Sequence, residues 1–176
     1  MNKAFTLVEL LVSIAVFSVV MTLAIGGYLV MLSINQRAQA LALATNNLAF
    51  VFEHMTRSIR TNTDYSCGST LGLGDCPSGG SAFTFLLGNG DEVTYSLSGN
   101  SIIREVDGVS SVLTDPSIHI DSLTFYVVGT EKFSDPGQDV RAPTVRMVVK
   151  GNVPGLKGVS PSFSMETMAT MRGIDL

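Results

Sequence analysis

A long run of uncharged residues near the N-terminus constrains this chain more than any other feature. From Leu10 to Ile34 no charged residue occurs. As an α-helix, this run of about 25 residues would extend over roughly 37 Å, since each residue adds about 1.5 Å. The hydrocarbon core of a bilayer is about 30 Å thick. The run therefore predicts one membrane-spanning helix.

The charges around this run predict its orientation. Lys3 is the only charged residue before Glu9, and positively charged flanks tend to stay in the cytoplasm. We therefore expect a single-pass protein of the cytoplasmic (inner) membrane, with everything after Ile34 outside the cytoplasm. A cleaved secretory signal fits less well, because its apolar region is typically about 7–15 residues long.

One acidic residue, Glu9, lies in the first turns of the expected helix. Placing an ionised carboxylate inside a membrane costs about 2.5–3.5 kcal/mol even on lenient insertion scales. An ordinary signal anchor has no reason to carry an acid at this point. Glu9 is therefore a candidate functional residue that needs a positively charged partner.

The N-terminal sequence Met1-Asn-Lys-Ala4, followed by Phe5-Thr-Leu-Val-Glu9-Leu-Leu, resembles that of type IV pilin-like precursors. These precursors are cut by prepilin peptidase and then N-methylated. The resemblance implies a leader peptide over residues 1–4, cleavage between Ala4 and Phe5, and methylation of the new N-terminus at Phe5. The family favours glycine where this chain has Ala4. Because alanine is the next smallest residue, we expect processing at a lower rate.

The same resemblance gives Glu9 a role in subunit docking. In a filament of parallel apolar helices, the Phe5 amine of an incoming subunit is a cation that must leave water. The Glu9 carboxylate of a neighbouring subunit can neutralise it, so that neither charge is left alone in a low dielectric. The implied partners are prepilin peptidase, other major and minor pilins or pseudopilins, the inner-membrane assembly platform and the lipid bilayer.

The predicted helix continues beyond the membrane-spanning segment. We expect a transmembrane or filament-core half over residues 5–34 and an amphipathic half over residues 35–60. Apolar residues of the second half recur at three- and four-residue steps, which indicates one buried stripe. The stripe consists of Leu41, Ala44, Leu48, Val51, Phe52, Met55 and Ile59. Gly26-Gly27 either weakens the helix locally or allows close helix packing.

From residue 61 to residue 176 the pattern predicts a β-rich head. Thr61–Ser81 is rich in Gly, Ser, Asp and Pro, so we expect a loop there. Later apolar residues alternate with period two, which indicates antiparallel strands. The strands are expected at residues 83–87, 93–97, 102–106, 118–128, 144–152 and 162–172, with turns at Gly99-Asn100 and Asp107-Gly108.

The apolar stripe of the helix is the natural cover for one face of this sheet. The predicted fold class is therefore α+β, with a long N-terminal helix packed on an antiparallel β-sheet head. The segments Met55–Arg60, Val93–Asp107 and Thr170–Arg172 also resemble minor pilins of the W type and minor pseudopilins of the J type, which act in type II secretion. This resemblance implies the pilin fold.

Two cysteines, Cys67 and Cys76, lie close together in the Gly-rich loop. They suit an oxidising compartment, and a disulfide between them would stabilise the fold by about 2.5–3 kcal/mol in the loop-entropy model. Two free thiols are the alternative. A metal site is not expected, because no further His or Cys lies nearby in the sequence.

No residue pattern predicts an enzyme or a cofactor. His54 and His119 belong to no metal-binding pair, and Asp121 would merely share a strand face with His119. The loop Glu131–Asp139 has three acids that could bind calcium, but it lacks the ligand spacing of a calcium loop. We prefer a solvated hairpin connection there. Catalytic residues, a metal and a cofactor are all expected to be absent.

Nucleic acid is not an expected partner. The net charge is −4, and the arginines are spread along the sequence among acids without neighbouring aromatic residues. The predicted function is thus that of a minor pilin or pseudopilin, which primes or joins a type IV pilus or a type II secretion pseudopilus. Two alternatives stay open: a DNA-uptake (competence) filament component, and a membrane-anchored binding domain that does not polymerise.

Overall fold

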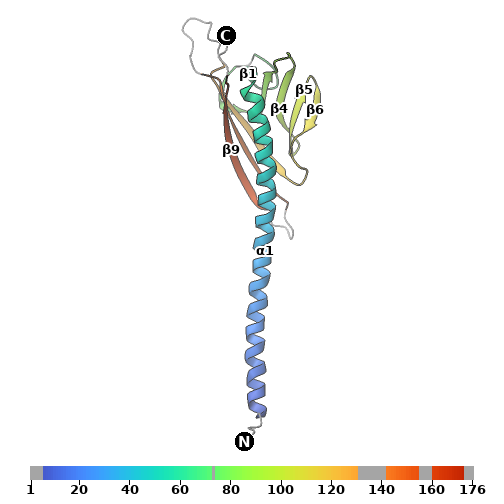
Figure 1. Cartoon of the computed structure of the whole chain (residues 1–176), viewed down its shortest axis with the longest axis vertical. Helices are drawn as coiled ribbons and strands as arrows, with labels where there is room; N and C mark the ends of the chain where they lie inside the picture. Colours follow the sequence, from blue (N-terminus) through green and yellow to red (C-terminus); the bar gives the residue numbers. More distant parts are fainter. Residues whose placement is uncertain (1–5, 73, 131–141, 155–159, 173–176) are drawn as a thin grey trace. The chain divides into compact units, whose positions relative to one another are not determined.

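The computed structural model describes residues 6–72, 74–130, 142–154 and 160–172 (Figure 1). Its contacts divide the chain into two units, Met1–Gln39 and Ala40–Leu176, which are described here separately. One helix, α1 (Leu7–Arg60), contributes residues to both units. The helix is continuous through Gly26 and Gly27, so the pair does not interrupt it.

The second unit contains two antiparallel sheets. The five-stranded sheet has the order β1-β3-β4-β5-β6, and the four-stranded sheet has the order β2-β7-β8-β9. The strands of the first sheet are β1 (Thr63–Cys67), β3 (Ala82–Leu86), β4 (Glu92–Ser98), β5 (Ser101–Val106) and β6 (Val109–Val112). Those of the second are β2 (Cys76–Gly80), β7 (His119–Val128), β8 (Thr144–Asn152) and β9 (Ser162–Thr170). The predicted α+β class is confirmed.

Glycine and aspartate set the two tight hairpins of the five-stranded sheet. Between β4 and β5, Gly99 has a φ of 58°, a left-handed value that glycine adopts readily at the first position of a type II′ turn. Between β5 and β6, Asp107 and Gly108 have φ values of 47° and 83°. Two consecutive positive values are typical of a type I′ turn, which matches the twist of the flanking strands.

The core forms where the apolar stripe of α1 meets both sheets. Six of the seven predicted stripe residues are buried, and Leu41 is half-buried. Aromatic side chains extend this core between the sheets: the ring centroids of Phe83 on β3 and Phe125 on β7 lie 5.7 Å apart. Tyr65 contacts Phe83 edge to face at 5.5 Å. The buried side chains therefore join the helix and the two sheets into one cluster.

The prediction of a loop over Thr61–Ser81 is wrong, because that segment contains β1 and β2. The strands of the head form two sheets. Strand β2 has the sequence Cys-Pro-Ser-Gly-Gly, which lacks the β-branched and aromatic residues typical of strands. It is a strand because β7 supplies its pairing partner. The short strand β6 was also not expected, and the last strand ends at Thr170.

The burial of α1 in the second unit gives a stability prediction with an internal control. Leu48 is 0% exposed, whereas Leu43, on the same helix, is 70% exposed. Leu48→Ala is expected to lower the free energy of unfolding by about 2–5 kcal/mol, because it leaves a cavity in the core. Leu43→Ala should change it by less than about 0.5 kcal/mol. Chemical denaturation of both variants tests this; equal losses would contradict the observed packing.

Candidate functional site

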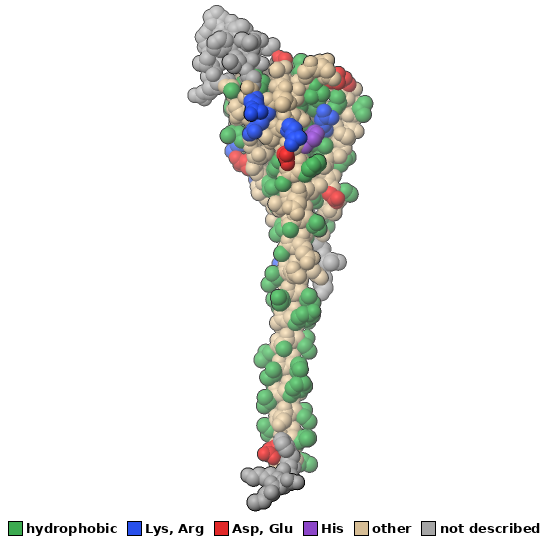
Figure 2. Space-filling model, viewed as in Figure 1, with side chains coloured by type: hydrophobic (Ala, Val, Ile, Leu, Met, Phe, Trp, Pro, Cys, Tyr) green, Lys and Arg blue, Asp and Glu red, His purple; other side chains and the backbone are tan. Residues whose placement is uncertain are grey.

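The first unit presents a long apolar surface over Leu10–Ile34. Every described residue from Thr6 to Gln39 is exposed, including large side chains such as Phe17 and Leu23. The helix contains an 18-residue window with a mean hydropathy of 2.4, and it is long and apolar enough to cross a membrane. Figure 2 shows hydrophobic side chains, in green, along this part of the chain.

Four serine and threonine hydroxyl groups within this apolar helix have hydrogen-bond partners in the helix itself. Ser13, Ser18, Thr22 and Ser33 each donate a hydrogen bond to a backbone carbonyl one turn earlier, at 2.7–2.8 Å. A hydroxyl without a partner would be costly in hydrocarbon. Because these groups bond to their own helix, they do not prevent the segment from entering an apolar environment.

Thr6 and Glu9 form a reciprocal cap at the start of α1. Glu9 Oε2 accepts hydrogen bonds from the Thr6 backbone N–H at 3.0 Å and from the Thr6 hydroxyl at 2.9 Å. The Glu9 backbone N–H donates to Thr6 Oγ1 at 3.3 Å. This is a capping box, which satisfies N–H groups that the first turn leaves without a helical partner.

The capping role of Thr6 was missed in the sequence, although a signal for it was present. Thr6-Leu-Val-Glu9 has the Ser/Thr-x-x-Glu spacing of a capping box directly before an apolar run. The consequence for Glu9 is chemical. Its Oε2 is held by Thr6, while its Oε1 has no hydrogen-bond partner among residues 6–72, 74–130, 142–154 and 160–172. The carboxylate can therefore accept a further donor without losing its cap.

The predicted cleavage site, Ala4-Phe5, lies outside the described residues, as does the acidic loop Glu131–Asp139. Cleavage after Ala4 and the pairing of a Phe5 amine with Glu9 therefore stay predictions. His119 and Asp121 are both exposed on β7, and Asp121 accepts hydrogen bonds from Asn152 at 3.1 Å.

The N-terminal sequence matches a motif of known proteins. Residues 1–25 match the family model described as the prokaryotic N-terminal methylation motif. The motif supports a type IV pilin-like protein, and it implies processing by prepilin peptidase and assembly with other pilins. Proteins with this motif are structural rather than catalytic. No curated protein and no solved structure matches the chain.

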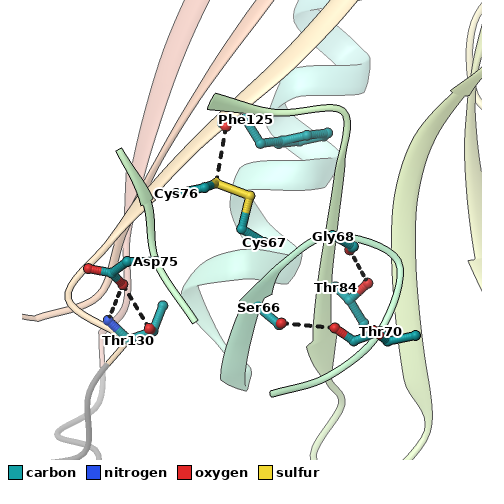
Figure 3. The surroundings of a disulfide bond; sticks show 9 residues. All are labelled: Ser66, Cys67, Gly68, Thr70, Asp75, Cys76, Thr84, Phe125 and Thr130. Atoms are coloured by element: carbon teal, nitrogen blue, oxygen red, sulfur yellow. Dashed lines mark hydrogen bonds between the residues drawn. A yellow bond between two sulfur atoms is a disulfide. The ribbon is translucent and has the colours of Figure 1, made fainter. Parts of the chain in front are cut away.

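The two cysteines form a disulfide, which confirms that prediction over free thiols. Cys67 ends β1 and Cys76 begins β2, and their Cα atoms lie 5.8 Å apart (Figure 3). These strands are edge strands of different sheets. The disulfide therefore links the two sheets covalently, a role that the spacing of the cysteines alone does not reveal.

The residues around the disulfide are closely packed and hydrogen-bonded. A side chain at Gly80 would overlap Cys67 Sγ, so only glycine fits there without rearrangement. Asp75, next to Cys76, accepts hydrogen bonds from the Thr130 N–H at 2.9 Å, the Thr130 hydroxyl at 2.7 Å and the Gly129 N–H at 3.0 Å. Partial burial works to raise the pKa of Asp75, but these hydrogen bonds lower it overall. The Asp75 carboxylate thus connects the disulfide loop to the residues that follow β7.

The arginines are less dispersed in space than their spacing in the sequence indicated. Arg57, Arg60 and Arg172 line one groove between α1 and β9. Burial and the neighbouring Arg104 and Arg57 lower the pKa of His54, which places Arg104 near the same part of the helix. Figure 2 shows basic side chains, in blue, on this face of the head. Folding brings these residues together because Arg172 follows the strand beside the end of α1.

The link between the sheets gives a prediction for the disulfide. Replacing both Cys67 and Cys76 by serine is expected to lower the free energy of unfolding by about 2.5–3 kcal/mol, because the unfolded chain regains the entropy of the open loop. Denaturation with and without reductant measures this. Reductant should destabilise the native chain and leave the double variant unchanged. A wild-type chain that is indifferent to complete reduction would contradict the role of the link.

Proposed function

We propose that the chain is a minor pilin or pseudopilin, a structural subunit that primes or joins a type IV pilus or a type II secretion pseudopilus. The observation that carries this proposal is the methylation motif of residues 1–25, which overlaps the exposed apolar helix surface of Leu10–Ile34. A surface of this kind needs either lipid or other apolar helices around it. A subunit that moves from a membrane into a helical filament core meets both environments in turn.

The Thr6–Glu9 cap supports the proposed docking step. Cleavage after Ala4 would place the new Phe5 amine next to Thr6 in the sequence. The amine of a neighbouring subunit would then donate to Glu9 Oε1, while Thr6 continues to hold Oε2. Such a pair neutralises both charges in an apolar filament core, where an isolated charge is costly. The head of residues 40–176 would present the surface that contacts partner subunits.

The resemblance of the head to W-type minor pilins and J-type minor pseudopilins supports a minor subunit over a major one. The presence of Glu9 favours a position with another subunit above it, because the subunit at the extreme tip has no neighbour above it whose amine needs pairing. A role for the chain in priming assembly together with other minor subunits follows from both arguments.

The first test of this function is the chemistry of the N-terminus. Mass analysis of the mature chain is expected to show the loss of residues 1–4 and one added methyl group on Phe5. Ala4→Gly should accelerate the cleavage, because prepilin peptidase favours glycine at this position. An intact Met1 on the mature protein would refute the proposal and favour a membrane-anchored domain that does not polymerise.

The second test separates the charge of Glu9 from its capping role. Glu9→Ala removes both, whereas Glu9→Gln removes only the charge, since glutamine also completes a capping box. Both variants should insert into the membrane at least as well as the wild type, because a costly acid is gone. Both should be recovered with sheared filaments in much smaller amounts than the wild type.

The comparison of the two variants decides the mechanism. If Glu9→Gln assembles normally and Glu9→Ala does not, Glu9 acts through helix capping and the proposed charge pair is wrong. If both assemble normally, Glu9 does not guide assembly. Cleavage after Ala4 and the folding of the head should be unchanged in both variants, since the first buried residue of the head core is Ala44, and both properties serve as controls.

A further inference from the structure

We propose that the groove between α1 and β9 binds an extended acidic segment of another protein, which adds to the sheet as a strand beside β9. We call it the α1–β9 groove. Its lining includes Phe52, Glu53, Arg57 and Arg60 from α1, together with Thr167 on β9 and Arg172 just after it. Its volume is about 490 Å³, within the range of about 300–1,000 Å³ of pockets that hold small ligands. Several side chains of a peptide fit such a space.

Strand β9, which contributes Thr167 to the groove lining, is an edge strand of its sheet. It is the last strand of its sheet and pairs only with β8 within the part of the chain that the structure describes. The pairing with β8 runs from Thr144↔Thr170 to Asn152↔Ser162 without a register shift. The other edge therefore presents a regular row of N–H and C=O groups, which is the template that an added strand uses.

The sequence of β9 lacks the features that normally protect an edge strand. Proteins block such edges with proline, lysine or a β-bulge. The strand Ser-Phe-Ser-Met-Glu-Thr-Met-Ala-Thr contains neither proline nor lysine and has no bulge. Its one charged residue, Glu166, lies 3.5 Å from Arg146 of the neighbouring strand. Within the part of the chain that the structure describes, this edge has no strand partner over Ser162–Thr170 and is therefore available to one.

The charges of the groove select an acidic occupant. Glu53 pairs with Arg57 at 2.9 Å. Arg60 and Arg172 have no ion pair among the residues that the structure describes. The Arg172 N–H donates to the Arg60 carbonyl oxygen at 3.2 Å, which holds the two residues together at one end of the groove. The guanidinium groups of Arg60 and Arg172, which line the groove, are suited to carboxylates on an added strand.

A peptide fits this groove better than a nucleic acid does. The free edge of β9 offers donors and acceptors alternately, and a peptide backbone matches both, whereas a phosphate backbone supplies acceptors only. Phe52 provides apolar surface for an uncharged side chain. Since strand residues point alternately to opposite faces, only every second side chain of the occupant would face the groove, and we expect acidic residues at those positions.

The experiment uses the full chain in detergent micelles and a labelled synthetic peptide of alternating Asp and Val. We expect saturable binding of this peptide, and binding at least about tenfold weaker for the matched peptide of alternating Lys and Val. Methylation of the peptide's backbone nitrogens, which leaves the charge unchanged, should also abolish binding, because it removes the donors of an added strand. Equal binding of the acidic and basic peptides would overturn the proposal.

Variants of the chain locate the binding. Arg60→Glu combined with Arg172→Glu should weaken binding of the acidic peptide by at least about tenfold. Arg37→Glu and Lys150→Glu together change the net charge equally but alter exposed residues that do not line the groove; this control should bind as the wild type does. Loss of binding in the control alone would place the site elsewhere and overturn the proposal.

Hydrogen exchange of the wild-type chain supplies a readout that needs no substitution. The peptide should slow exchange of the β9 amides and leave those of β6, the exposed edge of the other sheet, unchanged. Binding without protection of β9 would overturn strand addition. Tighter, arginine-dependent binding of a single-stranded oligonucleotide would also overturn it. The proposal concerns the head alone, so its failure would leave the proposed filament function untouched.

Discussion

The removal of apolar helix surface from water is the constraint on which the rest of this structure depends. In the second unit, one stripe of α1 is buried against both sheets, and Leu48, Met55 and Ile59 are fully buried there. From Thr6 to Gln39 the same helix is exposed on every side. Apolar surface on this scale does not remain in water. The sheets of the head cover the apolar stripe of α1 in the second unit. The apolar surface of the rest of the helix must be covered by lipid or by other chains.

Glu9, the acid at the start of this apolar segment, forms hydrogen bonds within the first turn of its own helix. Thr6 holds one carboxylate oxygen of Glu9 through its backbone and its hydroxyl, and the other oxygen has no hydrogen-bond partner among the described residues. The same residue thus serves the stability of the helix start and, as proposed, the recognition of a neighbouring amine. The two roles are compatible because a carboxylate accepts several hydrogen bonds at once.

In the head, two sheets pack against one helix. Phe83 and Phe125 pack between the sheets, and the Cys67–Cys76 disulfide joins them at the edges formed by β1 and β2. That arrangement leaves β6 and β9 as the edges away from the disulfide. Of these, β9 has the groove with Arg60 and Arg172 beside it, which distinguishes a prospective docking edge from an ordinary exposed one.

The sequence by itself determined the elements whose signal is local. The uncharged run, the stripe from Ala44 to Ile59 and the turn at Asp107-Gly108 could be predicted because periodicity and backbone preferences depend on near neighbours. Only the tertiary structure decided that β2 is a strand, that the disulfide links two sheets, and that Arg60 and Arg172 share a groove. Each of these depends on a partner far away in the chain. The pairing of β2 with β7, and of the end of α1 with the end of β9, is fixed by packing across the core, which no local pattern encodes.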